Sequence, residues 1–486
     1  MFSQLIAQGA EAPTELMAAR WQMALSLGFH IVLSCFGVAL PALIFVLHRR
    51  GLKHDDADSL ALAKKWAKVS AVLFAVGAVS GTILSFELGL LFPVMMSEFG
   101  DVIGLAFALE GIAFFLEAVF IGIYLYGWGR LAPKVHLATL YPIIASGAFG
   151  TFCIISVNAW MNNPAGFDRD PVTGEVINIE PLAAIFNYAV FWQSVHMFVA
   201  AYAVTGFLTA AVYAVGLLKG RNDRRHRVGL TVAMGFAVTA ALTQPVIGHF
   251  TGQRLAEDQP TKLAAMELSE ESEDRAPLTI GGLWIDGEKR FAIEIPLLGS
   301  FATGNSINQV VPGLNDFDED ELPPINVTHL AFQMMVAAGT VMALIATWFG
   351  WRFWRERRSG RNPDDRLGFG DDGPLFSNTW LLRAVVLGGG LSVLALETGW
   401  TATEVGRQPW IVYGELRTAD AVTTNSGVWI SLAVMIVVYT SMGLLAARVI
   451  RGMARRWRDD ADLDLPTPYG PSELDPEHAG RTPESV

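Results

Sequence analysis

Nine long apolar segments, almost free of charged residues, constrain this 486-residue chain more than any other feature. A helix needs about 20 mostly apolar residues to cross the hydrocarbon core of a bilayer. The segments cover residues 21–48, 67–93, 101–128, 137–161, 183–217, 228–248, 327–351, 379–401 and 428–448. We therefore expect an all-α membrane protein, folded as a bundle of nine transmembrane helices.

The composition supports this class and excludes others. Only 17% of the residues are charged and 52% are apolar, whereas a soluble protein carries about 25% charged residues. This excludes a disordered chain and a nucleic-acid binder with a basic face, so we expect no nucleic-acid partner. The two cysteines, Cys35 and Cys153, lie inside apolar segments, which offers neither a structural disulfide nor a CxxCH haem attachment.

Basic residues alternate between the two ends of the segments. Every loop that follows an odd-numbered segment is rich in Lys and Arg, for example at Arg49–Arg50 and Arg224–Arg225. Loops that follow even-numbered segments are poor in both and mostly acidic. The positive-inside rule then assigns the odd exits to the cytoplasm, the N-terminus to the outside and the C-terminus to the cytoplasm.

These segments divide the chain into four parts. Residues 1–248 carry helices one to six, 249–326 form a long outer loop, 327–450 carry helices seven to nine, and 451–486 form a cytoplasmic tail. A loop of this length is usually functional or a small folded element. It contains a strand-like stretch at 291–296. The tail is acidic and rich in proline, so we expect it to be disordered.

Ionisable residues occur within the apolar segments although each costs about 2.5–3.5 kcal/mol near the centre of a membrane. Repeated costs of this size indicate partners, a water path or a cofactor. Among the histidines, only two lie well inside a segment, and each suits either a haem ligand or a hydrogen bond between helices. The ionisable residues are His30, Glu87, Glu110, Glu117, His196, Glu397 and Glu404.

Two motifs leave a structural and a functional interpretation open. Glu110 and Glu117 are seven residues apart, about two helical turns, so both face one side, either bonded to neighbouring helices or forming a proton relay. The second motif contains Trp400, Glu404 and Arg407. Glu404 and Arg407 could form an ion pair beside an aromatic belt that includes Trp400, or the three residues could form a site for an anionic planar cofactor.

In the outer loop, the periodicity around Lys262 and Glu267 favours a short amphipathic helix at the surface.

The histidines also exclude two classes of haem protein. A haem–copper oxidase core needs six buried histidines, including an adjacent pair, and the chain has no His-His pair. A cytochrome b of the bc type needs segments that each contain two buried histidines, and no segment here has them. An ion-coupled transporter that uses the buried carboxylates stays open.

Six motifs give the chain a resemblance to subunit I of cytochrome bd quinol oxidase, over nearly the whole length before the tail. The last of them is highly specific. The motifs are QMALSLGFH at 22–30, FFLE at 114–117, NAWMNNP at 158–164, TKLAAME at 261–267, FQMMV at 332–336 and GRQPW at 406–410. SFELGL at 85–90 resembles the cyanide-insensitive branch of this family.

The resemblance implies three haems and their ligands. His196 and Met335 correspond to the axial pair of the low-spin haem b558. Glu404 corresponds to the axial ligand of the high-spin haem b595, and Trp400 lies near the haem pair. His30 corresponds to the axial ligand of the oxygen-site haem, which is haem d or a third haem b; members differ in which high-spin site holds haem d, so the haems of His30 and Glu404 are interchangeable here.

The resemblance also assigns residues to protons and quinol. Glu110, Glu117 and Asn158 correspond to residues at the oxygen site and the proton path. Lys262 and Glu267 match residues of the quinol loop that act in quinol binding and proton release.

The implied function is a terminal oxidase of the bacterial inner membrane. It would oxidise quinol at the outer face and reduce oxygen to water with cytoplasmic protons, generating a proton motive force. The implied partners are subunit II, as a heterodimer, and in some members a small single-helix subunit.

Overall fold

The computed structural model describes residues 13–358 and 373–458, and nine helices in these ranges are long and apolar enough to cross a membrane. The prediction of an all-α membrane fold is confirmed; the orientation of the termini stays a prediction. The spans are α2 (Thr14–His54), α3 (Ala57–Leu91), α4 (Pro93–Tyr126), α5 with α6 (Pro133–Ala138 and Leu140–Asn162), α8 (Val190–Leu218), α9 (Arg224–Asp258), α12 (Ile325–Arg358), α14 (Thr379–Val405) and α16 (Val428–Arg458).

Several helices continue beyond the apolar segments that predicted them. Helix α9 runs to Asp258, so the outer loop begins later than the expected residue 249. Helix α16 runs to Arg458, so residues 451–458 are helical and not part of a disordered tail. The backbone hydrogen bonds of a helix do not require apolar side chains, and a helix therefore continues where its sequence becomes polar. The rest of the expected tail lies outside the described residues.

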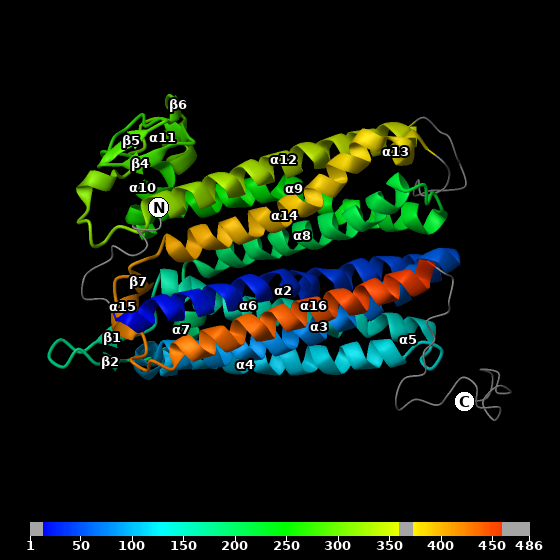
Figure 1. Ribbon diagram of the computed structural model, residues 1–486, viewed down its shortest axis with the longest axis horizontal. Coiled ribbons are helices and arrows are strands. Elements are labelled where there is room, and N and C mark those ends of the chain that lie inside the picture. Colours follow the sequence, from blue (N-terminus) through cyan, green and yellow to red (C-terminus); the bar gives the residue numbers. More distant parts are fainter. Residues whose placement is uncertain (1–12, 359–372, 459–486) are drawn as a thin grey trace. The chain divides into compact units, whose positions relative to one another are not determined.

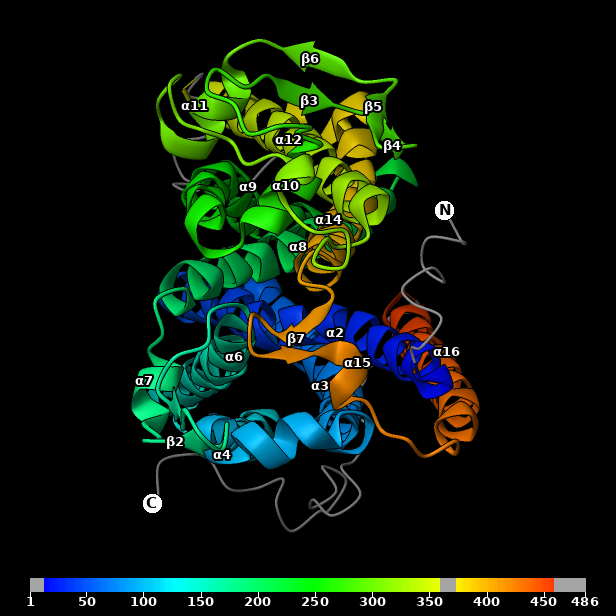
Figure 2. The ribbon, with the colours of Figure 1, turned by 90° about the vertical axis from the view of Figure 1, so that its left-hand side faces the viewer.

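The spans pack in neighbouring pairs, with α2 against α3, α4 against α6, α8 against α9, and α12 against α14 (Figure 1). Helix α8 also packs against α2 and α14, where the two groups of helices in the end-on view meet (Figure 2). One group contains α8, α9, α12 and α14, and the other contains α2, α3, α4 and α6.

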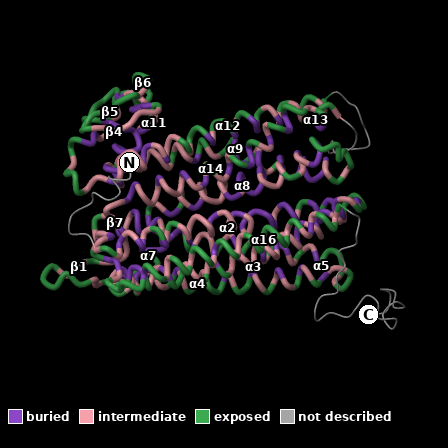
Figure 3. Tube along the Cα trace, viewed as in Figure 1, coloured by how far each residue is buried: buried purple, intermediate pink, exposed green. Residues whose placement is uncertain are grey.

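Buried residues follow the faces that the helices turn toward one another (Figure 3). The main apolar cluster draws on both groups of helices and includes Leu43, Phe207 and Met234. Gly206 lets α8 and α9 approach closely, since a Cβ there would lie 2.8 Å from the backbone nitrogen of Ala237. Small residues at such crossings are typical of membrane helices, which associate by close packing rather than by the hydrophobic effect.

The outer loop between α9 and α12 folds into short elements. Strand β3 pairs with β6 and β4 pairs with β5, both antiparallel. The strand-like stretch at 291–296 forms β6. The elements of the loop are α10 (Pro260–Glu267), β3 (Leu278–Ile280), β4 (Leu283–Ile285), β5 (Glu288–Arg290), β6 (Ile293–Ile295), α11 (Leu298–Gly304) and η1 (Leu314–Asp316).

Helix α12 fastens this loop to the membrane part. The two ring nitrogens of His329 lie 2.8 Å from the carbonyl oxygen of Met266 and 2.9 Å from that of Gly281. One turn further along, Gln333 Nε2 donates to the carbonyl oxygen of Thr279 at 2.9 Å. The loop is therefore held at the second and third turns of α12.

Further short elements lie in the remaining connections. They are β1 (Asp168–Arg169), β2 (Val176–Ile177), α7 (Pro181–Ile185), α13 (Pro374–Ser377), β7 (Trp410–Val412), β8 (Leu416–Arg417) and α15 (Thr418–Ala421).

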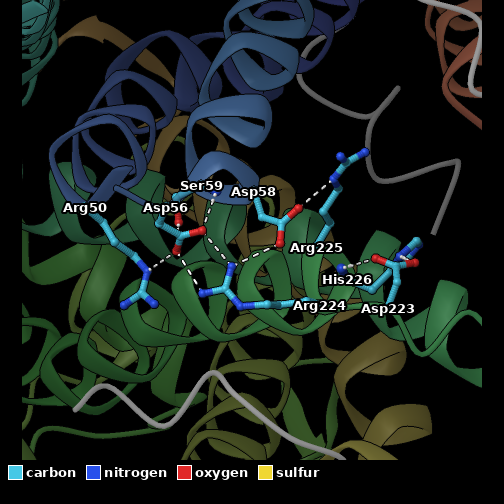
Figure 4. Close-up of polar contacts among 8 residues, drawn as sticks. All are labelled: Arg50, Asp56, Asp58, Ser59, Asp223, Arg224, Arg225 and His226. Carbon is cyan, nitrogen blue, oxygen red and sulfur yellow. Dashed lines mark hydrogen bonds and ion pairs between the residues drawn. The ribbon is translucent and has the colours of Figure 1, made fainter. Parts of the chain in front are cut away.

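An ion-pair network fastens the turn between α2 and α3 to the start of α9 (Figure 4). The buried carboxylate of Asp56 accepts from Arg50 Nε at 2.9 Å and from Arg224 Nη1 at 2.6 Å. Burial by itself raises the pKa of Asp56, but hydrogen bonds from Arg224, Ser59 and Arg50 outweigh it and hold this pKa well below its usual value. The folded state thus gains stability from the ionised carboxylate above the unfolded pKa, and loses it as the pH falls through the folded value.

Replacement of Asp56 by alanine leaves Arg50 and Arg224 without this shared partner at a buried site. Breaking a buried pair from one side costs about 3–5 kcal/mol, so we expect a clearly lower thermal unfolding midpoint for the Asp56→Ala protein in detergent. Glu288→Ala is the matched control, because Glu288 pairs with Arg290 at the exposed surface. Equal midpoints for the two variants would show that the network does not stabilise the fold.

Candidate functional site

A chain of hydrogen bonds joins the outer loop to the end of α14. Lys262 Nζ on α10 donates to Asn162 Oδ1 at 3.0 Å. Asn162 Nδ2 donates to the backbone oxygen of Asn158 at 2.8 Å and to its Oδ1 at 3.2 Å. Asn158 Nδ2 donates to Glu404 Oε1 at 2.6 Å. Three segments far apart in sequence therefore meet through Asn158 and Asn162, which are one helical turn apart at the end of α6.

Arg407 bonds to Glu404, the last residue of this chain of hydrogen bonds. Its Nη2 donates to Glu404 Oε2 at 2.5 Å, while its buried Nε and Nη1 have no hydrogen-bond partner among the described residues. Unused donors on a buried guanidinium fit an anionic ligand such as a carboxylate. A carboxylate has about four lone-pair positions, so Glu404 keeps acceptor capacity for a metal after both of these bonds.

Helix α10 is buried, which corrects the surface position expected from its periodicity. Lys262 is 4% and Glu267 is 7% exposed. The expectation failed because periodicity along one helix carries no information about what covers it, and here the ends of α6, α9, α12 and α14 do. Burial and, to a lesser degree, the charge of Arg407 lower the pKa of Lys262 to about 7, against the opposing effect of Glu404. Burial raises the pKa of Glu267 to about 7.

A pocket lies beside this network, between the first turns of α8 and the last turns of α9. Trp192 and Gln193 of α8 line it, together with Asp258, Gln259 and Asn162. Gln259 Nε2 donates to Asn162 Oδ1 at 3.0 Å, whereas its buried Oε1 has no partner among the described residues. The pocket thus offers an aromatic wall and an unused carbonyl acceptor.

The predicted low-spin ligands lie on helices of one group. His196 follows the pocket residue Trp192 by one turn of α8, and its buried Nδ1 has no hydrogen-bond partner among the described residues. A Cβ on Gly248 of α9 would lie 3.5 Å from His196 Cε1. Met335 lies on α12 opposite α14, where a Cβ on Gly399 would lie 2.8 Å from its sulfur. Glycines thus leave room around both side chains.

His30 packs against α3, whereas Trp400 lies near the contact of α2 with α8 and α14. His30 Nδ1 lies 2.9 Å from Ser80 Oγ of α3, a contact that leaves the other ring nitrogen to a metal. Trp400 packs at the edge of a cluster that contains Ile31 and Leu396. Because α14 runs to Val405, Trp400 and Glu404 are i, i+4 neighbours on one helix.

The two carboxylates of α4 differ in their surroundings. Glu117 is buried, and its Oε1 has no hydrogen-bond partner among the described residues. Glu110, two turns earlier, is half-buried, and no hydrogen bond joins it to the described part of the chain. Both differ from Glu404, which is bonded at each oxygen. Glu404 is therefore held by hydrogen bonds at both oxygens, whereas Glu110 and Glu117 have no hydrogen-bond partner among the described residues.

Sequence analysis missed the residues that connect the site. Asn162 and Gln259 received no role, although Asn158 and Asn162 have the i, i+4 spacing that places two amides on one face at the end of a helix. Glu87 is 2% exposed and accepts from Gln22 Nε2 at 2.9 Å. The spacing could have indicated the asparagine pair, but nothing in the sequence indicates that Lys262 reaches it.

The low pKa of Lys262 gives stability a specific pH dependence. The folded chain releases this proton near pH 7, whereas an unfolded lysine keeps it up to about pH 10.5. The unfolded state binds more protons between these values, so the contribution of Lys262 to stability rises with pH. We expect Lys262→Met to remove this rise in the thermal unfolding midpoint. Lys219→Met, at an exposed site, should keep it; a wild-type pH profile for Lys262→Met would contradict the assignment.

Comparison with known proteins agrees with this geometry. The model of the family "cytochrome bd terminal oxidase subunit I" matches residues 18–457. A putative cytochrome bd menaquinol oxidase subunit I of Bacillus subtilis is 33% identical over 93% of this chain and 99% of its own length. The cytochrome bd-II ubiquinol oxidase subunit 1 of Escherichia coli is 25% identical over 92% of this chain and 98% of its own length.

Among solved structures, bd oxidase from Geobacillus thermodenitrificans is similar with a TM-score of 0.83 and 34% identity, over 92% of this chain and 99% of that chain. Sequence and fold thus agree over almost the whole described part. The chain therefore belongs to the cytochrome bd terminal oxidase subunit I family, and it is a haem-binding membrane oxidoreductase subunit.

Proposed function

We propose that this subunit oxidises quinol at the outer face of a bacterial inner membrane and reduces oxygen to water with cytoplasmic protons. Family membership favours this oxidase over an ion-coupled transporter. The observation that carries the proposal is the pocket between α8 and α9, which lies one helical turn from His196 and presents the unused acceptor of Gln259. A quinol donor and the first haem ligand would then be neighbours.

His196 and Met335 would hold the low-spin haem b558. The unpaired Nδ1 of His196 and the room left by Gly248 and Gly399 support this ligand pair. An imidazole and a thioether together raise the potential of a haem. When bound, the haems supply the electron transfer and the reduction of oxygen, while the protein supplies ligands, orientation and exclusion of water.

Glu404 and His30 would hold the two high-spin haems, b595 and either haem d or a third haem b. The free donors of Arg407 suit a haem propionate, and Asn158 and Arg407 together orient the Glu404 carboxylate. Trp400 provides an aromatic face beside the same turn of α14. The contact with Ser80 orients His30.

The pocket would bind quinol with its ring against Trp192 and one hydroxyl donating to Gln259 Oε1. Asp258 lines the same pocket and could receive a proton from the quinol. Lys262 does not line the pocket, so it would act indirectly, by holding the pocket residue Asn162 in place. Glu267, whose pKa near 7 allows it to change charge at working pH, would carry protons toward the outer face.

Glu117 would deliver protons to the oxygen site, with Glu110 further along the same face of α4. Their lack of hydrogen-bond partners among the described residues supports a role in proton transfer over a role in joining helices. Because protons for water would come from the cytoplasm and those of quinol would leave outside, charge would separate without a pump. Subunit II would be the partner, with a small single-helix subunit as a further candidate.

The low-spin ligands can be tested with adjacent methionines. We expect Met335→Leu to abolish the low-spin band in the reduced-minus-oxidised spectrum of the purified oxidase while the high-spin bands remain, because leucine offers the iron no ligand. Met334→Leu is the control, since Met334 is exposed and adjacent on the same helix. His196→Ala should act like Met335→Leu. Unchanged low-spin bands in both would refute the pair.

Lys262 can be tested through quinol kinetics. Loss of one charge-assisted hydrogen bond, worth about 1.5 kcal/mol, should raise the KM for quinol about tenfold in Lys262→Met. The haem spectrum should keep its wild-type form, because Lys262 is not a proposed ligand. Lys219→Met should retain the wild-type KM. A wild-type KM in Lys262→Met would limit this lysine to a structural role.

A further inference from the structure

A group of buried rings lies at the end of the helices that carries Arg49 and Arg130. His48 of α2, Tyr124 of α4 and His136 of α5 are each at most 3% exposed. His48 Nδ1 lies 3.0 Å from the hydroxyl oxygen of Tyr124. His136 Nε2 lies 2.8 Å from the backbone oxygen of Tyr124, and its ring is 5.0 Å from that of His48. Two imidazoles and a phenol thus form one polar cluster among apolar residues.

A small cavity adjoins this cluster on the side away from the basic end. Tyr124 and Ser70 contribute hydroxyl-bearing side chains to its lining, which is otherwise apolar. It has room for about one water molecule. A water there has polar partners available on α3 and α4.

The far side of this cavity leads toward Glu117. A Cβ on Gly147 would lie 3.4 Å from both carboxylate oxygens of Glu117, and one on Gly37 would lie 3.9 Å from its Oε1. The cavity is lined by Pro41, Ile121 and Ile143, which are each four residues from Gly37, Glu117 and Gly147 respectively. On three helices, therefore, the cavity lies one turn from the level of Glu117, while Tyr124 of the ring cluster lines the cavity directly.

We propose that His48, Tyr124 and the cavity form the proton uptake path to Glu117. This inference rests on the proposed oxidase function and on the basic end being cytoplasmic. A proton held on His48 Nδ1 passes to the Tyr124 oxygen while the phenol gives its own proton to a water in the cavity. The proton crosses the remaining helical turn to Glu117 through a second water, and His48 takes up the next proton from the basic end. Each group ends the cycle as it began.

Distance makes the cavity necessary to this path. Tyr124 and Glu117 are seven residues apart, which is about 10 Å along the helix axis, so no single hydrogen bond joins them. Ser70, across the cavity on α3, offers a second hydroxyl to the water. A purely structural cluster would require neither a cavity on this side nor a buried carboxylate oxygen without a partner one turn further.

The test compares two tyrosines of α4 in the purified two-subunit oxidase. Tyr124→Phe keeps the ring and removes the relay hydroxyl. Tyr126→Phe is the matched control, because Tyr126 is 47% exposed at the same end of the same helix. Positioned proton transfer contributes about 10²–10⁴-fold to a rate, and leakage through water offsets part of this. We expect kcat for oxygen consumption to fall about tenfold in Tyr124→Phe only.

Further readouts separate proton delivery from structural damage. The KM for quinol, the haem bands and the rate of haem reduction by quinol without oxygen should remain at wild-type values, while the solvent deuterium isotope effect on kcat should increase. Ser70→Val, which removes the second hydroxyl and fills the cavity, should reproduce this pattern even if Tyr124→Phe loses haem.

Two results would overturn the inference. One is wild-type kcat and isotope effect in both Tyr124→Phe and Ser70→Val. The other is a fall in kcat that is matched by a fall in haem content in both variants, which would make the cluster structural. A wild-type preparation without haem bands would instead refute the proposed oxidase function itself.

Discussion

The cost of holding polar groups inside a membrane-spanning bundle governs this structure. Each such group needs a hydrogen-bond partner, a ligand or water, and the described residues divide accordingly. Glu404 is bonded at both oxygens. His196, Glu117 and Arg407 instead keep buried atoms without a partner. We assign cofactors and transferred protons to these unpaired atoms. The free-energy cost of burying a polar atom without a protein partner indicates that a cofactor, a water or a proton is bound there.

The two amide side chains at the end of α6 also provide a hydrogen-bond partner for a buried residue of the outer loop. Asn158 and Asn162 connect Lys262 on α10 with Glu404 on α14. A proposed quinol-loop residue and a proposed haem ligand are thus held by one rigid helix end. Substitution at either amide would disturb both, which argues for analysing quinol kinetics and haem spectra together in any variant of this network.

The sequence predicted the parts of the site that depend on residue type and depth. His30, His196 and Glu117 were identifiable because ionisable groups are rare in apolar segments. Asn162 and Gln259 were not, because amides are common at helix ends and only their partners distinguish them. The burial of α10 was likewise not predictable, since the pattern along eight residues does not report which other helices cover them.

Hydropathy and charge by themselves determined that this chain crosses a membrane nine times in its described part, because a bilayer requires long apolar helices whose backbone bonds are internal. Motif resemblance indicated the family. Only the tertiary structure decided which polar groups meet: Lys262 with Asn162, Asn158 with Glu404, and His48 with Tyr124. Each contact joins helices distant in sequence, and their packing is set by side-chain shape across the whole bundle, which no local pattern records.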